Sequence, residues 1–200
     1  MAWMDPVPET LVEDGMRGDR VATLLAAVRR AEAGAVDNLF SLLYPDLRQM
    51  AHARLRRSGH LTLLDTTGLV HEAYLRLFKA GSLDADDRMQ FMAYAARVMR
   101  SVVVDFVRRR AADRRGGDAV HVEFEESAVA VADPREREVV RIDEALQELA
   151  AIDERLVRVV EMRYFAGMTE EQVADALGLS RRSVTRDWEK ARLFLAAALD

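Results

Sequence analysis

Residues 169–192, TEEQVADALGLSRRSVTRDWEKAR, decide the fold of the C-terminal part of the chain. Thr169 followed three residues later by Gln172 forms a capping box, which predicts a helix directly after the threonine. Gly178 predicts the end of that helix, and Ser180 predicts the N-cap of a second one. Two helices joined by a glycine turn are typical of a helix-turn-helix, although any helical hairpin shares these features.

The second predicted helix has an apolar side and a basic side. Val184, Trp188 and Ala191 recur at helical spacing and are predicted to face inward. Arginine is the side chain best shaped to read guanine in the major groove. Asp187 and Glu189 are the acidic exceptions on this helix. The side left outside carries the residues that we expect to contact DNA: Arg181, Arg182, Ser183, Thr185, Arg186 and Lys190.

The composition favours an all-α protein. Half of the 200 residues are hydrophobic, 32% are charged and only 6% are aromatic, and alternating strand patterns are nearly absent. The chain contains no cysteine and its four histidines are scattered, so we expect neither a metal site nor a cofactor. It contains no signal peptide and no long apolar run, which predicts a cytoplasmic protein without a membrane partner.

Two small helical domains are predicted, with a flexible tail over residues 1–20 and a flexible acidic linker over 116–133. Asp133-Pro134 with Glu136 predicts the start of the second domain by an N-cap, a first-position proline and a capping-box acid. The first domain, 21–115, has apolar helical periodicity over 21–30, 35–55, 69–78 and 89–112. The second domain, 134–200, is predicted as a four-helix unit with helices at 134–150, 154–166, 170–177 and 181–198.

The net charge of −5 hides an uneven distribution. Residues 97–115 contain seven arginines and two aspartates, whereas residues 118–133 contain acidic residues and no lysine or arginine. A basic helix followed by an acidic linker indicates a nucleic-acid partner for the first domain as well.

Three motifs in this order resemble a bacterial sigma factor of the extracytoplasmic-function type, over roughly residues 21–199. LVHEAYLRLF (69–78) is similar to the helix that docks on core RNA polymerase, and FMAYAARVMRSVVVDFVRRR (91–110) to the helix that binds the start-proximal promoter element. RYFAGMTEEQVADALGLSRRSVTRDWEKARLFL (163–195) resembles the helix-turn-helix that reads the upstream promoter element. The resemblance implies a non-catalytic subunit that directs polymerase to certain promoters.

The resemblance also implies roles for residues of the first domain. Residues 82–90 would capture an unstacked base, with stacking from Phe91 or Tyr94, although both also fit the core stripe. Backbone contacts would come from arginines, a salt-sensitive contribution with little sequence information. The start-proximal candidates are Arg88, Phe91, Tyr94, Arg97, Arg100, Arg108, Arg109 and Arg110. The polymerase-binding candidates are Leu69, Glu72, Leu75, Arg76 and Lys79, of which Glu72 and Arg76 are also spaced for an ordinary i,i+4 pair.

One stretch departs from the family. Most members have an Asp-Ala-Glu-Asp run before the docking helix, where this chain has Asp65-Thr66-Thr67-Gly68. A phosphate on Thr67, or on Thr66, would restore the missing negative charge at a helix N-terminus. We therefore predict a sigma factor that a Ser/Thr protein kinase activates; simple N-capping by a threonine is the alternative. No anti-sigma factor can be deduced from the chain, and one stays open as a partner.

Two other functions are compatible with parts of the sequence. A helix-turn-helix regulator that acts without polymerase explains the second domain equally well, but not the basic helix of the first. An enzyme would need a nucleophile or a paired acid and base, and none stands out in the sequence. Four apolar residues of the second domain are compatible either with a groove that binds the polymerase flap or with the core: Leu156, Val160, Phe165 and Leu193.

Overall fold

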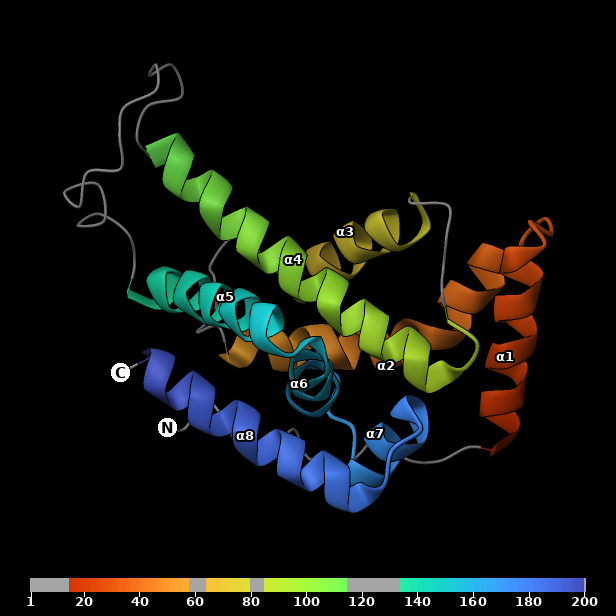
Figure 1. Ribbon diagram of the computed structural model, residues 1–200. Helices are drawn as coiled ribbons and strands as arrows, with labels where there is room; N and C mark the ends of the chain where they lie inside the picture. The colour runs from red at the N-terminus through yellow and green to blue at the C-terminus, as the bar shows by residue number, and fades with distance from the viewer. Residues whose placement is uncertain (1–14, 58–63, 80–84, 115–133, 200) are drawn as a thin grey trace.

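The computed structural model describes residues 15–57, 64–79, 85–114 and 134–199 (Figure 1). Within these ranges the chain is helical with short connections and contains no strand, so the predicted all-α class is confirmed. The first helix begins at Gly15, inside the segment predicted as a tail. The predicted linker 116–133 lies outside the described residues.

The first unit consists of α1 (Gly15–Arg29), α2 (Ala35–Arg57), α3 (Thr66–Lys79) and α4 (Arg88–Arg114). Each helix packs on the next along the chain, and α4 also contacts α1 and α2. Leu39, Leu43 and Leu47 recur every four residues on α2 and are all buried. The long α4 is therefore held along one face of the unit by its apolar stripe.

The second unit consists of α5 (Pro134–Ile152), α6 (Glu154–Val160), a π-helical turn η3 (Glu161–Phe165), α7 (Glu170–Leu177) and α8 (Arg181–Leu199). Here α8 packs on α5, α6 and α7. Pro134 opens α5 as predicted. The proposed cap Asp133 lies outside the described residues.

The helix predicted over 154–166 divides into an α-helical and a π-helical part. Its last turn widens, because the backbone N–H of Ala166 donates to the carbonyl of Glu161, five residues earlier, at 2.9 Å. Gly167, at φ +71°, then ends the helix as predicted. Single π-helical turns often occur at functional positions, and this one begins with the buried Glu161.

The turn between α7 and α8 has the predicted geometry. The hydroxyl of Thr169 accepts from the backbone N–H of Gln172 at 3.2 Å, and the Gln172 side chain accepts from the backbone N–H of Thr169 at 2.9 Å. Gly178 is left-handed, at φ +64°, a conformation that glycine adopts without a Cβ penalty. The Ser180 hydroxyl accepts from the N–H of Ser183 at 3.2 Å and caps α8.

Replacing Thr169 with alanine is expected to lower the free energy of unfolding by about 1 kcal/mol, because the capping box loses its hydroxyl acceptor. Urea denaturation followed by circular dichroism measures this. Thr169→Ser keeps the acceptor and serves as the control. Equal stabilities of the alanine variant and the unsubstituted protein would contradict the role of the cap.

The two units pack against each other. α4 contacts α5, η3 and α7, and the buried apolar side chains of both units form one core. Figure 1 shows α5 and α6 between α4 and α8, which places the second helix of the helix-turn-helix on the side of the second unit away from α4. The start-proximal candidate helix is therefore covered along one side, whereas α8 is not covered by α4.

Candidate nucleic-acid interface

The outer side of α8 carries the predicted basic surface. The exposed residues are Arg181, Arg182, Arg186 and Lys190. The residues that face the core, as predicted, are Val184, Trp188 and Ala191. Ser183 and Thr185 are half-buried. Arg182 and Lys190 form no ion pair with any described residue, so their charges are available to a ligand.

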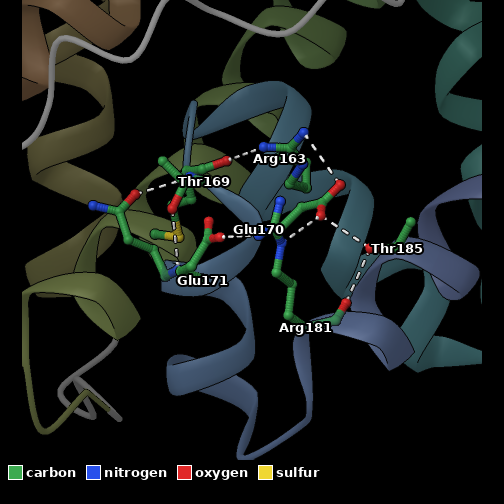
Figure 2. Close-up of polar contacts among 8 residues, drawn as sticks. Arg163, Thr169, Glu170, Glu171, Arg181 and Thr185 are labelled. Atoms are coloured by element: carbon green, nitrogen blue, oxygen red, sulfur yellow. Dashed lines mark hydrogen bonds and ion pairs between the residues drawn. The ribbon is translucent and has the colours of Figure 1, made fainter.

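Glu170, the first residue of α7, connects the two helices of the motif (Figure 2). Its carboxylate accepts from the Thr185 hydroxyl at 2.9 Å and from Arg181 Nε at 3.3 Å, and Arg163 Nη2 lies 4.0 Å away. Arg181 also pairs with Glu171 at 2.9 Å. Two of the predicted DNA contacts, Arg181 and Thr185, are thus already held by α7, and a phosphate or base would compete with these carboxylates.

Asp187 lies inside and not on the basic surface. Its side chain is 0% exposed, with Arg155 Nε at 2.8 Å and Arg186 Nε at 3.6 Å. From the sequence, Asp187 was identified only as an acidic exception among the basic side chains of this helix, and its burial was not predicted. Its spacing could have shown this, since it lies three residues after Val184 and four before Ala191, on the apolar side.

The start-proximal candidates at the beginning of α4 are mostly buried or paired. Phe91 is 0% exposed and belongs to the core. Arg88 Nη2 donates to the buried Asp46 carboxylate at 2.8 Å. Tyr94 is half-buried, and the exposed Arg97 lies 5.7 Å from its ring centroid, so Tyr94 is the better placed of the two aromatic side chains for stacking.

The five α4 arginines predicted to bind the DNA backbone divide into two groups. Arg97 and Arg109 are exposed and form no ion pair with a described residue. The other three form ion pairs with carboxylates of the second unit, although the Arg108 side chain is 49% exposed. The pairs are Arg100 Nη1 with Asp143 Oδ1 (2.6 Å), Arg100 Nη2 with Glu161 Oε1 (2.9 Å), Arg108 Nη2 with Asp143 Oδ2 (3.3 Å) and Arg110 Nη1 with Glu136 Oε1 (3.3 Å).

These second-unit carboxylates are buried, and of the three only Glu136 had a role predicted from the sequence. The Glu161 side chain is 6% exposed, and its burial raises the pKa above the ordinary glutamate value, while Arg100, Arg97 and Arg158 act in the opposite direction. Asp143 also accepts from Gln147 Nε2 at 2.8 Å. Glu136, predicted as a capping-box acid, places its carboxylate against Arg110.

The polymerase-binding candidates on α3 lie on different sides of the helix. Leu75 is 57% exposed, whereas Leu69 is buried in the core. Arg76 forms the i,i+4 pair with Glu72 (3.3 Å) and a shorter pair with Asp105 of α4 (2.6 Å). The side chain of the fifth candidate, Lys79, lies outside the described residues.

The N-terminus of α3 is capped by an aspartate. The Asp65 carboxylate accepts from the backbone N–H of Gly68 at 2.6 Å. Thr67 is exposed and Thr66 is half-buried in this first turn. The capping position that the alternative assigned to a threonine is thus filled by Asp65, which leaves the Thr67 hydroxyl accessible.

Of the four residues proposed for a flap groove, Leu156, Val160 and Phe165 are buried and Leu193 is 74% exposed. Residues 82–84 of the base-capture segment lie outside the described residues.

Within the described ranges, no group of three acidic or histidine side chains is arranged to hold a metal ion. None of the described helices combines the length and apolarity needed to cross a membrane.

Comparison with known protein families places most of the chain in one family. The family model described as ECF sigma factor matches residues 18–200. The matched region includes α2 to α8 and most of α1, so both units fall inside it. No curated protein matches the chain.

Proposed function

Because the chain belongs to the ECF sigma factor family, we propose that it directs core RNA polymerase to promoters through surfaces on α8, α4 and α3. ECF sigma factors are non-enzymatic polymerase subunits for promoter-specific transcription initiation, so core polymerase and promoter DNA are its partners. The observation that carries the residue assignment is the basic outer side of α8, with Arg182 and Lys190 unpaired among the described residues.

Residues 134–200 form the domain that reads the upstream element. Arg182 and Arg186 reach base edges, and Lys190, Ser183 and Thr185 contact the backbone. Thr185 and Arg181 are oriented by Glu170 before DNA arrives. DNA that binds these two side chains exchanges the Glu170 carboxylate for a phosphate as their acceptor.

Residues 21–115 form the domain that binds the start-proximal element and polymerase. Tyr94 stacks on an unstacked base and the α4 arginines hold the backbone. Leu75 is the apolar anchor toward polymerase, because a large aliphatic side chain this exposed has no partner within the described fold.

Activation involves phosphorylation of Thr67 by a Ser/Thr protein kinase. Thr67 is exposed in the first turn of the 14-residue α3, where the helix dipole favours negative charge. No acidic residue occupies this first turn. A phosphate there adds about −1.5 to −2 charges and three acceptor oxygens toward the polymerase surface that the family contacts with its acidic run.

We expect phosphorylated Thr67 to strengthen binding to core polymerase by about tenfold, from one or two charge-assisted hydrogen bonds. Thr67→Glu is expected to give part of this gain and Thr67→Ala none. The affinities are measured from the binding of each form to surface-immobilised core polymerase. Ser41→Glu, on the exposed side of α2, adds the same charge elsewhere and is the control. Equal promoter activity of the alanine and glutamate variants, in cells that carry the kinase, would exclude the switch.

Run-off transcription on genomic fragments tests the function itself. Core polymerase with the unmodified protein or with Thr67→Glu is expected to give transcripts with defined starts. A gain confined to Thr67→Glu supports the phosphorylation step. Sequence-selective DNA binding without any transcript from either form would favour a helix-turn-helix regulator instead.

A further inference from the structure

The guanidinium of Arg76, a predicted polymerase contact, is bound on every nitrogen within the first unit. Nε and Nη2 donate to the Glu72 carboxylate, both at 3.3 Å. Nη1 donates to the Asp105 carboxylate of α4 at 2.6 Å and to the Ser101 hydroxyl at 3.1 Å. The neighbouring Leu75 is 57% exposed, whereas the Arg76 side chain is 28% exposed. Because successive helical residues point about 100° apart, Arg76 lies on the α4 side of α3 and Leu75 on the outer side.

Asp105 lies on α4 between two exposed arginines that form no ion pair with a described residue. Arg97, Ser101, Asp105 and Arg109 follow one another at intervals of four residues, so they share one stripe of the helix. Arg109 Nε donates to the backbone carbonyl of Asp105 at 3.3 Å, which places its guanidinium beside that residue. The stripe on which the proposed function has arginines hold the DNA backbone therefore contains a carboxylate.

An unpaired carboxylate at this position would oppose the binding of a phosphate. Four residues of α-helix rise about 6 Å, which is less than the Debye length of about 8 Å at physiological salt. The charge of Asp105 therefore acts on a phosphate bound at Arg109 without full screening. Arg76 cancels this charge from α3, which packs beside α4 (Figure 1).

Stability alone does not account for the contact between Arg76 and Asp105. The Asp105 side chain is 42% exposed, and ion pairs this accessible contribute little to folding. The apolar side of α3 already holds the helix in the core through Leu69, Ala73 and Leu77, all of which are buried. The pair is therefore better explained by the charge that it removes from the surface of α4.

We infer that Arg76 is a positioning residue for DNA binding by α4 and not a contact for polymerase. The inference rests on the proposed function, because it supposes that α4 binds the promoter backbone. Arg76 neutralises Asp105, so a phosphate that approaches the stripe meets the charges of Arg97 and Arg109 without a competing carboxylate. Arginine suits this role, because its planar fork reaches Glu72 and Asp105 at the same time.

The test uses the full chain with Arg76→Gln and Asp105→Asn, alone and together. Arg48→Gln removes an exposed arginine from α2 of the same unit and is the control for lost charge. The first measurement is the affinity of each form for surface-immobilised core polymerase, with Leu75→Ala as the variant of an outward-facing residue. The second is the affinity of the holoenzyme, assembled with saturating protein, for a promoter duplex identified by run-off transcription.

Arg76→Gln is expected to lower promoter affinity about tenfold and to make the slope of log affinity against log salt shallower by about 0.9, the contribution of one phosphate contact. Adding Asp105→Asn is expected to restore most of both, because the carboxylate that opposed the phosphate is then gone. All three forms are expected to bind core polymerase as the parent does, whereas Leu75→Ala binds it more weakly. Arg48→Gln is expected to change promoter affinity far less than Arg76→Gln does.

Three results would overturn the inference. One is a loss of affinity for core polymerase in Arg76→Gln as large as that in Leu75→Ala, which would show a polymerase contact. Another is a loss of promoter affinity that Asp105→Asn does not reverse, because neither a brace between α3 and α4 nor a direct contact of Arg76 with DNA is restored by removing the carboxylate. The third is an unchanged promoter affinity in Arg76→Gln.

If circular dichroism shows that Arg76→Gln does not fold, Asp105→Asn alone decides. This substitution removes the carboxylate and leaves Arg76 bound to Glu72 and Ser101, so promoter affinity is expected to rise. An affinity equal to that of the parent would count against the inference.

Failure of the proposed function is visible separately, as absence of transcripts from the unsubstituted protein. The same forms are then compared without polymerase on a short mixed-sequence duplex. They carry Arg182→Ala and Arg186→Ala in addition, which removes the main proposed contacts of α8. The same order of affinities is expected there, and equal affinities of all forms would overturn the inference.

Discussion

Replacing Arg182 and Arg186 with alanine is expected to weaken binding to promoter DNA by roughly 1,000-fold. Both side chains are exposed on the outer side of α8, one turn apart. An arginine that reads a guanine contributes about 2 kcal/mol, and two independent losses of this size amount to about three powers of ten. Neither side chain is part of the core, and the buried Asp187 keeps its shorter pair with Arg155 when Arg186 is removed, so the fold is expected to be unchanged.

Fluorescence anisotropy with a labelled promoter duplex measures this loss at fixed salt. Arg137→Ala with Arg158→Ala removes two exposed arginines from the same unit outside α8 and is the matched control. We expect the control to lose less than tenfold, through general electrostatics alone. Equal losses in both double variants would mean that α8 is not the reading helix.

Replacing Phe91 with alanine is expected to lower the free energy of unfolding by about 4 kcal/mol. The ring is 0% exposed in the core. Its truncation loses the free energy gained by burying the ring and leaves a cavity, which adds a further cost. For a chain of this length, the loss corresponds to a fall of roughly 12 °C in Tm. Any effect on transcription would then follow from a smaller folded fraction.

Tyr94 provides the comparison, because it is half-buried on the same helix. Tyr94→Ala is expected to cost about 1 kcal/mol of stability and yet weaken binding to a single-stranded start-proximal oligonucleotide, through loss of stacking worth about 1–3 kcal/mol. Differential scanning calorimetry and the binding assay separate the two roles. A stable Phe91→Ala protein with impaired DNA binding would reverse the assignment.

The sequence predicted the local structure of the second unit well, because short-range chemistry determines it. The capping box at Thr169, the left-handed turn at Gly178 and the Ser180 cap were all confirmed. Each depends on residues three or four positions apart, which a sequence displays directly. The widening of the helix at Glu161 was not predicted, because no glycine or proline marks it.

The candidate site was harder to predict, because burial depends on the partner element. Helical spacing alone was compatible with Phe91 either stacking on a base or packing in the core. The packing of α4 on its neighbours shows that the side chain belongs to the core. Asp143 carried no signal beyond its position on an apolar stripe, and Arg100 looked like a free DNA contact. The ion pair between Arg100 and Asp143 joins residues 43 positions apart, and such a tertiary contact cannot be predicted from a local sequence pattern.

The helix α8 lies on the far side of the second unit from α4. This position affects how the protein distinguishes promoters by the length of the spacer between their two elements. One straight duplex along α8 does not reach α4 while the units are packed, so the free protein has no means of comparing the two promoter elements. The two elements can then be contacted together only in an arrangement in which the units lie apart. Promoters with a wrong spacer would accordingly be rejected at the holoenzyme stage, not during the search by the free subunit.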